Sequence, residues 1–504
     1  MQRGGRSFLP RRTHRERPVT LVDPPAARPD SRAGLILPTL AFAGIVVSLM
    51  QTLVVPLIHA LPDLLNTSSA TASWVVTSTL LAAAVVTPIA GRLGDMVGKR
   101  RMILISMAFL VVGSVVCALS STVTPVIIGR ALQGAATGAI PLGISILRDE
   151  LSRERVASAI SVMSSTMGVG GAIGLPVAAW TAQSYSWHAL FWAAAILGAL
   201  VAISVAVLVP ESAVRTPGRF DYPGAIGLAG GLVALLLALT KGAQWGWTSP
   251  LTLGLLGASI VIFLMWGTIE LRTTDPLVDL RVSASATVLL TNGASVLTGF
   301  AMYATSLTVP QLLQAPPETG YGLGRSMVAA SLCMAPAGIV MMMLSPVSAR
   351  LTRRHGPRVT LMVGTTVIAA GYLIGAVAMN SIWQLAVVST IIGAGIGIAY
   401  AAMPALIMGA VPIRETGAAN GLNSLMRLVG TSFAAAAMTV VLTSMTQQHG
   451  PVEVPTREAF VVTFLIGGGA AVIALLVAFF IPRRAPEREP TASARVEVGA
   501  GSAR

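Results

Sequence analysis

The sequence predicts an all-α polytopic membrane protein with about 14 transmembrane helices. Hydrophobic residues make up 54% of the 504 residues and charged residues only 11%, whereas soluble globular proteins carry about 25% charged residues. Apolar runs long enough to span a bilayer recur along the whole chain. Basic residues gather in alternate loops between these runs, which is the pattern of a polytopic protein and not of a soluble one.

Each predicted span is a run of about 20 mostly apolar residues. The seventh is the shortest, and the first is too long for the apolar part of a signal peptide, so it is expected to anchor the chain. The predicted spans are Gly34–Ile58, Ala72–Ala90, Met102–Leu119, Val126–Leu147, Val156–Trp180, Leu190–Val209, Ala225–Thr240, Leu251–Glu270, Val288–Val309, Met327–Val347, Val359–Met379, Ile382–Val411, Ala418–Met445 and Ala459–Ile481.

The basic residues predict the orientation of these spans. Of the 34 Lys and Arg, sixteen lie in loops on the same side as the two tails and three in loops on the other side. The positive-inside rule therefore predicts a multi-pass protein of the cell inner (plasma) membrane with both termini cytoplasmic. The formal net charge of +14 is explained by this topology and by tails that contact anionic lipid, so no nucleic-acid partner is expected.

Two pairs of similar segments in distant parts of the chain predict an internal repeat. The charged loop Gly91–Arg101 after the second span resembles the loop Ala349–Arg358 after the tenth. Arg153-Glu154 and Ala157 then match Arg414-Glu415 and Ala418 at nearly the same offset. Either similarity alone could be chance similarity between cytoplasmic loops. The two together favour a parallel repeat with a substrate site between its halves.

The repeat and the composition divide the chain into five parts. We expect a basic disordered cytoplasmic tail (residues 1–33), an N-terminal six-helix half (34–209), a linker with two extra transmembrane helices (210–282), a C-terminal six-helix half (283–481) and a second disordered cytoplasmic tail (482–504).

Several motifs carry a family resemblance. The loop motif places Gly91, Asp95, Gly98, Lys99 and Arg100, and the fourth span contains Arg130-Ala131-Leu132-Gln133-Gly134. The fifth span contains Gly168, Gly170, Gly171, Gly174 and Pro176, and the sixth opens with Ser186–Phe191. Together they resemble the major facilitator superfamily, and within it the fourteen-helix drug:proton antiporter branch. The resemblance implies the major facilitator fold, with two six-helix halves and two inserted helices.

Three positions depart from the family pattern. Met50 stands where the branch usually has an Asp in the first helix, Leu175 separates Gly174 from its proline, and the second loop motif has Arg353 in place of Asp. The first departure removes the carboxylate that usually couples transport to protons.

Asp95 is expected at a loop-to-helix junction. Its carboxylate could accept hydrogen bonds from the start of the third helix or pair with a cation of the opposite half. The alternative is a solvated turn maintained by the positive-inside rule, and Lys99 and Arg100 largely fit that alternative. Orientation requires neither an acid nor glycines, so Asp95, Gly91 and Gly98 favour a gate.

Intramembrane ionisable residues suggest coupling sites. Arg130 and Gln133 in the fourth span are candidates, the alternative being a packing residue that extends toward the interface. Arg427 in the thirteenth span could contact an anionic substrate, pair between the halves or simply pack. No carboxylate is predicted at the midplane, so Asp95, Asp149 and Glu150 are the inner proton-binding candidates, with His59 and Asp63 at the outer mouth.

Substrate contacts are expected from polar, aromatic and sulfur-containing side chains predicted near the midplane: Met50, Gln51, Thr52, Trp74, Tyr303 and Gln311, together with Arg427 and the Met341–Met343 run. Such side chains can accommodate flat or amphipathic molecules. The alternative for each one singly is packing against lipid or protein.

The leading interpretation is a monomeric secondary transporter that exports small hydrophobic or amphipathic compounds, as in drug or antibiotic efflux. It would be driven by a proton gradient and need no cofactor or metal. The alternative is a facilitator-fold membrane sensor or scaffold that has lost proton coupling. No GxSxG, HExxH, CxxC or P-loop motif suggests an enzyme. The expected partners are the small-molecule substrate and the lipid bilayer.

Overall fold

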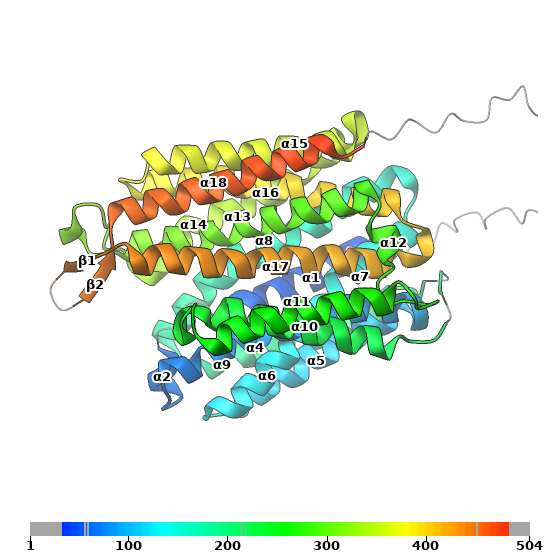
Figure 1. The fold of residues 1–504 in the computed structure, drawn as a ribbon, viewed down its shortest axis with the longest axis horizontal. Coiled ribbons are helices and arrows are strands. Elements are labelled where there is room, and N and C mark those ends of the chain that lie inside the picture. The colour runs from blue at the N-terminus through cyan, green and yellow to red at the C-terminus, as the bar shows by residue number, and fades with distance from the viewer. Residues whose placement is uncertain are drawn as a thin grey trace, which may run out of the picture.

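The computed structural model describes residues 33–54, 57, 60–212, 214–216, 218–449 and 452–482. Almost all of these residues are helical, and the long helices run side by side along one axis (Figure 1). Twelve of the described helices are long and apolar enough to cross a membrane. The prediction of an all-α polytopic membrane protein is confirmed.

The two remaining predicted spans are also helical. The fourth is built from α6 (Val123–Ala135), the 3₁₀ turn η2 (Ala136–Gly138) and α7 (Ala139–Glu150), which follow one another directly. The tenth is α14 (Met327–Met343), which has 17 residues. The architecture therefore agrees with about fourteen spans.

The first group of helices covers the predicted N-terminal half. Its members are α1 (Ala33–Thr52), α2 (Leu61–Leu64), α3 (Ser69–Ala72), α4 (Trp74–Val97), α5 (Lys99–Leu119), α6, η2, α7, α8 (Arg153–Ser184) and α9 (His188–Leu208). α1 ends at Thr52, six residues before the predicted end of the first span. His59 lies outside the described residues.

A helical hairpin and a second group follow. The hairpin consists of α10 (Tyr222–Trp245) and α11 (Pro250–Glu270). The second group consists of α12 (Leu280–Ser283), α13 (Ala286–Gln314), η3 (Pro317–Thr319), α14, α15 (Ser345–Val377), α16 (Ile382–Ala410), η4 (Ile413–Glu415), α17 (Thr416–Ser444) and α18 (Arg457–Phe480). Between α17 and α18 lies an unpredicted antiparallel pair, β1 (Thr446–His449) and β2 (Val452–Pro455), with Thr446 opposite Pro455.

Capping side chains mark where many helices begin. Asp221 accepts a hydrogen bond from the Gly224 N–H at the start of α10, and Ser249 accepts one from the Thr252 N–H at the start of α11. Ser326 does the same for α14. Each cap satisfies one backbone donor that the first helical turn leaves free. Polar residues between the apolar runs thus set the positions of the helix ends.

Four clusters of buried apolar side chains form the core, and the smallest consists of Val288, Ile407 and Val411. One lies within residues 36–209 with a contribution from Met408, and a second lies within residues 294–481. The third joins α4, α10, α11 and α17, with Leu232, Trp266 and Leu425 among its members. The hairpin α10–α11 therefore packs along the line where α4 meets α17. The other side of α11 is exposed and apolar, as expected for a surface in contact with lipid.

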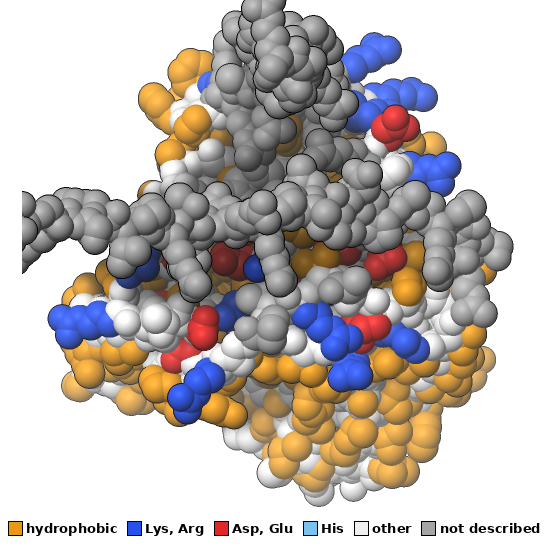
Figure 2. Space-filling model, turned by 90° about the vertical axis from the view of Figure 1, so that its right-hand side faces the viewer, with side chains coloured by type: hydrophobic (Ala, Val, Ile, Leu, Met, Phe, Trp, Pro, Cys, Tyr) orange, Lys and Arg blue, Asp and Glu red, His pale blue; other side chains and the backbone are white. Residues whose placement is uncertain are grey.

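We use "basic end" for the end of the bundle at which α4 meets α5, α7 meets α8 and η4 meets α17. Figure 2 looks onto this end, where Lys, Arg, Asp and Glu side chains form a band bordered by hydrophobic side chains. The predicted cytoplasmic loops Gly91–Arg101, Arg148–Arg155 and Ala349–Arg358 lie here. The opposite end carries α2, α3 and the β1–β2 pair (Figure 1).

The two predicted repeat loops share a backbone feature and a contact. Gly98, between α4 and α5, has φ +128°, and Gly356, at a kink inside α15, has φ +84°. Each stands seven residues after the start of its motif, in a conformation that only glycine adopts readily. Two residues later, the guanidinium of Arg100 donates to the Ala206 carbonyl, and that of Arg358 donates to the Phe479 carbonyl. Arg100 thus binds the end of α9 and Arg358 the end of α18, which are the last helices of their groups.

Candidate functional site

Asp95 connects two helices from opposite halves of the sequence. It lies in the last turn of α4 and is 1% exposed. Its carboxylate accepts hydrogen bonds from the backbone N–H groups of Gly417 (3.1 Å) and Ala418 (2.8 Å), in the first turn of α17. A helix N-terminus carries partial positive charge and unpaired N–H donors, so a carboxylate is well stabilised there. Asp95 thus forms the hydrogen bonds to a helix N-terminus that were one of the two possibilities considered, but the helix is α17 of the opposite half and not the third predicted helix.

Glycines make this approach possible. A Cβ added to Gly91 would lie 2.4 Å from the Gly417 carbonyl oxygen, and one added to Gly417 would lie 2.6 Å from the Asp95 carboxylate. Both distances are below van der Waals contact, so α4 and α17 can come this close only where both residues lack side chains. We call the contact between α4 and α17 the first seam.

Lys99 completes a buried charge network beside the first seam. Its ammonium lies 2.6 Å from the Asp149 carboxylate and 3.7 Å from that of Asp95, and it donates to the Thr416 hydroxyl at 3.4 Å. Lys99 is 1% exposed. The solvated turn considered for Lys99 is therefore contradicted, since the side chain is buried between two carboxylates.

The segment that follows α9 covers this network. Glu211 accepts hydrogen bonds from the N–H groups of Arg100 (3.2 Å) and Arg101 (3.3 Å) at the start of α5, and Ser212 donates to Asp149 at 2.6 Å. Thr216 donates its N–H to the Asp95 carbonyl and its hydroxyl to the Arg414 carbonyl. These residues could not be predicted from the sequence, because a polar segment after a span carries no pattern of its own.

Glu150 lies at the last position of α7, beyond the predicted end of its span. Burial raises the pKa of its carboxyl group, and the neighbouring carboxylate of Asp149 adds to the shift. Among the proposed coupling residues, the structure thus places Asp95, Asp149 and Glu150 together at the basic end.

A second seam joins α8 to α14 and to the start of α15. A Cβ on Gly338 would lie 2.1 Å from the Gly168 carbonyl oxygen, so the α8 and α14 backbones cross in close contact. Nearer the basic end, the Ser345 hydroxyl bonds to the Ser161 carbonyl (3.2 Å) and the Ser165 hydroxyl (3.0 Å). The second seam corresponds to the first with the roles of the two halves exchanged.

The other residues of the predicted fifth-helix motif have separate surroundings. Gly170 and Gly174 pack against α1, where added Cβ atoms would meet Ser48 and Thr52. A Cβ on Gly171 would meet nothing within 4 Å, and Pro176 is an internal residue of α8. The motif therefore serves both the second seam and the packing of α8 on α1.

Within the described residues, the hydrogen bonds between positions 33–209 and positions 283–482 all fall in the part of the bundle nearer the basic end. They involve Asp95, Lys99, Ser161 and Ser165 on one side and Ser345, Thr416, Gly417 and Ala418 on the other. The polar contacts between the two halves are therefore concentrated at the basic end.

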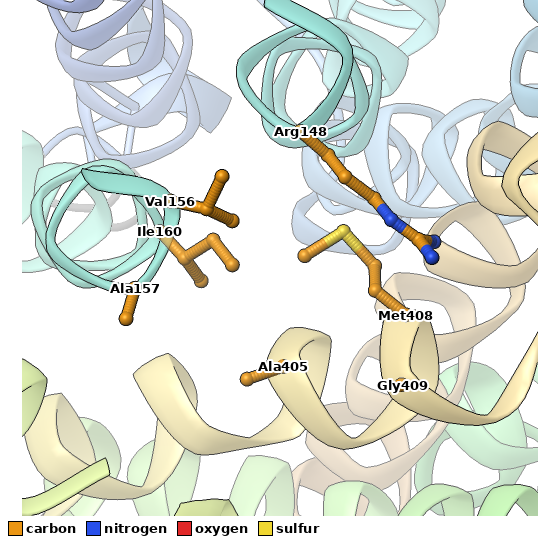
Figure 3. A pocket seen from close by; sticks show the side chains of 7 residues that line it. All are labelled: Arg148, Val156, Ala157, Ile160, Ala405, Met408 and Gly409. Carbon is orange, nitrogen blue, oxygen red and sulfur yellow. The ribbon is translucent and has the colours of Figure 1, made fainter. Parts of the chain in front are cut away.

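A cavity of about 220 Å³ lies between the seams near the basic end. α7 and α8 line it on one side and α16 on the other, and Arg148 and Met408 extend from α7 and α16 along one edge (Figure 3). The remaining lining residues are Val156, Ala157, Ile160, Ala405 and Gly409. The cavity thus has walls from both halves and is mostly apolar.

Arg130 is buried in the first half. One terminal nitrogen donates to the Met50 carbonyl (3.0 Å) and to the Gln133 side-chain oxygen (2.6 Å), and Gln133 donates in turn to Ser114 (2.7 Å). Its Nε has no hydrogen-bond partner among the residues that the structure describes. Arg130 thus links α6 to α1 through a carbonyl rather than a carboxylate.

Arg427 is the corresponding buried cation of the second half. It donates to Asn423 and Ser424, each at 2.8 Å, and its guanidinium lies 5.0 Å from the Tyr400 ring centroid. Sequence analysis identified the arginine but missed Asn423 and Tyr400. Both could have been identified from the sequence by their positions inside predicted spans, because placing a polar side chain in a membrane costs free energy.

The remaining substrate candidates do not form one midplane cluster. Met50, Gln51 and Thr52 lie in the last turn of α1, and Trp74 is the first residue of α4, so all four are at the end opposite the basic end. Gln311 is exposed near the end of α13 and lines a separate cavity of about 270 Å³ with residues of α17 and the β1–β2 pair. The structure therefore does not bring these five residues into one cluster. Tyr303 and Arg427 lie deeper within α13 and α17.

Lys241 was predicted in a loop, but the structure places it inside α10, which continues to Trp245. It is 1% exposed and lies 4.7 Å from the Trp74 ring centroid. Its ammonium also donates to the Ser73 hydroxyl and to the Ala70 carbonyl. The hairpin is therefore fixed to the start of α4 at the end opposite the basic end.

This architecture of paired helical halves, two close seams and an inserted hairpin defines a class of polytopic helical membrane proteins. The chain belongs to the Major Facilitator Superfamily, whose family model matches residues 40–265 and 291–500. The major facilitator fold expected from the sequence motifs is confirmed.

Several relatives are named as transporters or as resistance and export proteins. An uncharacterised MFS-type transporter of Mycobacterium tuberculosis is 30% identical over 416 residues, which cover 80% of this chain and 59% of that relative's length. The Tetracenomycin C resistance and export protein of Streptomyces glaucescens is 29% identical, covering 86% of this chain and 80% of its own. Multidrug resistance protein 3 of Bacillus subtilis is 27% identical, covering 71% and 70%. These relatives confirm the resemblance to drug-efflux transporters.

Among solved structures, the chain is similar to the human organic anion transporter MFSD10. The TM-score is 0.62 at 14% sequence identity, covering 90% of this chain and all of that one. At this identity the likeness describes the fold alone.

Proposed function

We propose that this protein is a secondary active transporter that exports small hydrophobic or amphipathic compounds by alternating access, in exchange for protons. The contact of Asp95 with the first turn of α17 carries the proposal. It joins the two halves with a single side chain and can be broken without unfolding either half. The names of the relatives, which refer to multidrug resistance and antibiotic export, support the direction of transport.

The positive-inside rule supports a cytoplasmic location of the basic end and of both termini. In that orientation, the contacts of the two seams would close the cytoplasmic side, and we assign the conformation as outward-facing on that ground. Export would proceed when Asp95 leaves α17 and the halves rock about the substrate. The cavity lined by Ala157 and Ala405 would then enlarge into the cytoplasmic vestibule.

Proton exchange requires a group whose protonation changes with conformation. The sequences of α1, α13 and α16 contain no carboxylate. We therefore assign coupling to the buried group at the basic end, in which Asp95 and Asp149 share Lys99. Protonating Asp95 would weaken its bonds to α17, which would link proton uptake to opening of the first seam.

Transport into everted membrane vesicles tests the proposal. Vesicles with the protein should accumulate hydrophobic fluorescent compounds, and collapse of the proton gradient should abolish accumulation. Accumulation that persists after collapse would contradict proton coupling.

A membrane sensor or scaffold is the second candidate, and Met50 in place of the usual first-helix Asp favours it. Such a protein would bind ligands without accumulating them under any gradient. The same vesicles distinguish the two, because a scaffold gives no accumulation while ligand binding by the purified protein remains.

A further inference from the structure

Among the described residues, one buried positive charge of the second half has no charged partner. α13, α16 and α17 together contain a single charged residue, Arg427. It lies 11 positions after Thr416, the first residue of α17, which corresponds to a depth of about 16 Å, near the middle of a hydrocarbon core about 30 Å thick. A cation at this depth is costly and, where retained, marks a pathway for substrates or ions.

The surroundings of Arg427 orient it but do not neutralise it. Asn423 and Ser424 accept one hydrogen bond each, whereas a guanidinium has five N–H donors. Asn423 is itself held in place, since its amide donates to Asn292 (2.9 Å) and Ser295 (2.7 Å). The result is a preorganised guanidinium with unused donors, supported by neutral groups only.

Asn420 supplies an independent observation. It is 2% exposed, and within the described part of the chain neither its amide oxygen nor its amide nitrogen has a hydrogen-bond partner. Asn420 lies seven residues before Arg427, on the same face of α17. Long side chains of a helix point toward its N-terminus, so Arg427 extends toward the level of Asn420. Burying an unpaired amide costs free energy, and a bound ligand could supply the missing partner.

We propose that Arg427 and Asn420 form a subsite for the anionic group, a carboxylate or phenolate, of an amphipathic organic substrate. This inference rests on the proposed function and specifies its substrate class. The anion would accept hydrogen bonds from the free guanidinium donors and from the Asn420 amide, while the apolar part of the molecule would lie against neighbouring aromatic and sulfur-containing side chains. A bidentate contact with a carboxylate is the interaction for which arginine is best suited.

Binding to the purified full-length protein tests this without any gradient. The protein is placed in nanodiscs of phosphatidylcholine, which carries no net charge, so anionic lipid cannot compete. The probes are 7-diethylaminocoumarin-3-carboxylate and its methyl ester, which share one fluorophore and differ by one charge. Fluorescence anisotropy gives a Kd for each, and the ratio of the two values isolates recognition of the anion.

We expect the wild type to bind the carboxylate more tightly than the ester. Arg427→Gln should weaken carboxylate binding by about 10-fold to 100-fold and ester binding much less, since a hydrogen bond to a charged group is worth that factor. Arg427→Lys should retain part of the preference and shows whether charge at this position suffices for folding. Arg325→Gln is the matched control, because it removes an exposed charge from the same group of helices.

Asn420→Ala separates binding from structure. It should weaken carboxylate binding several-fold while leaving the ligand-free thermal stability equal or higher, because it deletes a buried amide without partners. Equal affinity of the wild type for acid and ester, or an equal loss of both in Arg427→Gln, would overturn the proposal. Since no gradient is involved, these outcomes are independent of whether the protein exports by proton exchange.

Discussion

At the residue scale, Asp95 shows why a short motif can control a large movement. Its carboxylate is shared between Lys99 of its own half and the first turn of α17 in the other half. Neither half needs this contact in order to fold, since each has its own apolar core. The free energy of the contact therefore affects mainly the balance between conformations.

Asp95→Asn should shift that balance toward a conformation open at the basic end. The amide keeps the volume but loses the charge, and hydrogen bonds to a charged group are worth about 1.5–3 kcal/mol. A cysteine introduced at Ala157, in the cavity wall, should then react faster with a thiol reagent, while transport falls and expression is maintained. Arg101→Gln is the control, because Arg101 is exposed. Unchanged labelling and transport in Asp95→Asn would contradict the proposal that Asp95 keeps the basic end closed.

The partner of Asp95 could not be predicted, although the motif itself was evident. Asp95 and Gly417 are 322 positions apart, and hydrophobic patterns carry no information on such pairs. The same limit applies to Arg427, which the sequence identified without its partner Asn423. The free-energy cost of placing a polar or charged side chain in the membrane marks that residue as important. Only the three-dimensional arrangement shows what the residue contacts.

At the element scale, the α10–α11 hairpin has contacts that differ between its two ends. Near α17 it contributes apolar side chains such as Leu232 to a shared cluster. At the end opposite the basic end, Lys241 and Gln244 hydrogen-bond to Ser73. Apolar contacts allow sliding more readily than directed polar bonds, so the hairpin should move with α4.

A cross-link between the hairpin and α4 should therefore be tolerated. The Gln244 amide lies 3.2 Å from the Ser73 hydroxyl, so cysteines at both positions can be joined by a short bifunctional thiol reagent. We expect transport to remain near the level of the unlinked double mutant. Loss of transport upon cross-linking would show that the hairpin moves relative to α4.

The close crossing of α8 and α14 gives a second prediction at this scale. Gly338→Ala should lower the free energy of unfolding by about 1–3 kcal/mol, the usual cost of overpacking. The reason is that the new Cβ would lie 2.1 Å from a backbone atom of α8. Gly171→Ala is the matched control, since its Cβ would meet nothing within 4 Å and alanine favours the helix. Equal melting temperatures of the two variants in detergent would contradict the close crossing.

The elements themselves were largely predictable, because each apolar run of spanning length became a helix. The failures occurred where a helix end depends on distant contacts. α10 continues past its predicted end because Lys241 is satisfied by Ser73 and Trp74. α1 stops at Thr52, short of its predicted end, although the apolar pattern continues. Hydropathy alone therefore did not predict where α1 ends.

At the scale of the whole molecule, the sequence predicted two related halves, and the structure adds an asymmetry between their seams. The first seam is closed by Asp95 at the N-terminus of α17, whereas the second is closed by the hydroxyls of Ser345 and Ser165. In the second loop, Arg353 takes the place of the acid and is exposed. A change of protonation should therefore act directly on the first seam only, because the contacts of the second seam are between neutral groups.

Alternating access requires both seams to open, and the second offers a direct test. The Ser165 and Ser345 hydroxyls lie 3.0 Å apart on opposite halves. Cysteines at both positions, in a background with the buried Cys117 and Cys333 replaced by serine, can be cross-linked in membrane vesicles. The Ser73–Gln244 cross-link serves as the control, because it does not join the two halves.

The most direct measurement is transport by the Ser165→Cys/Ser345→Cys protein before cross-linking, after cross-linking and after release with a reductant. We predict activity, then loss of activity, then recovery, with no such loss in the Ser73→Cys/Gln244→Cys control. Undiminished transport by the cross-linked protein would contradict the account, because substrate would then cross the membrane while the halves stay joined at the basic end.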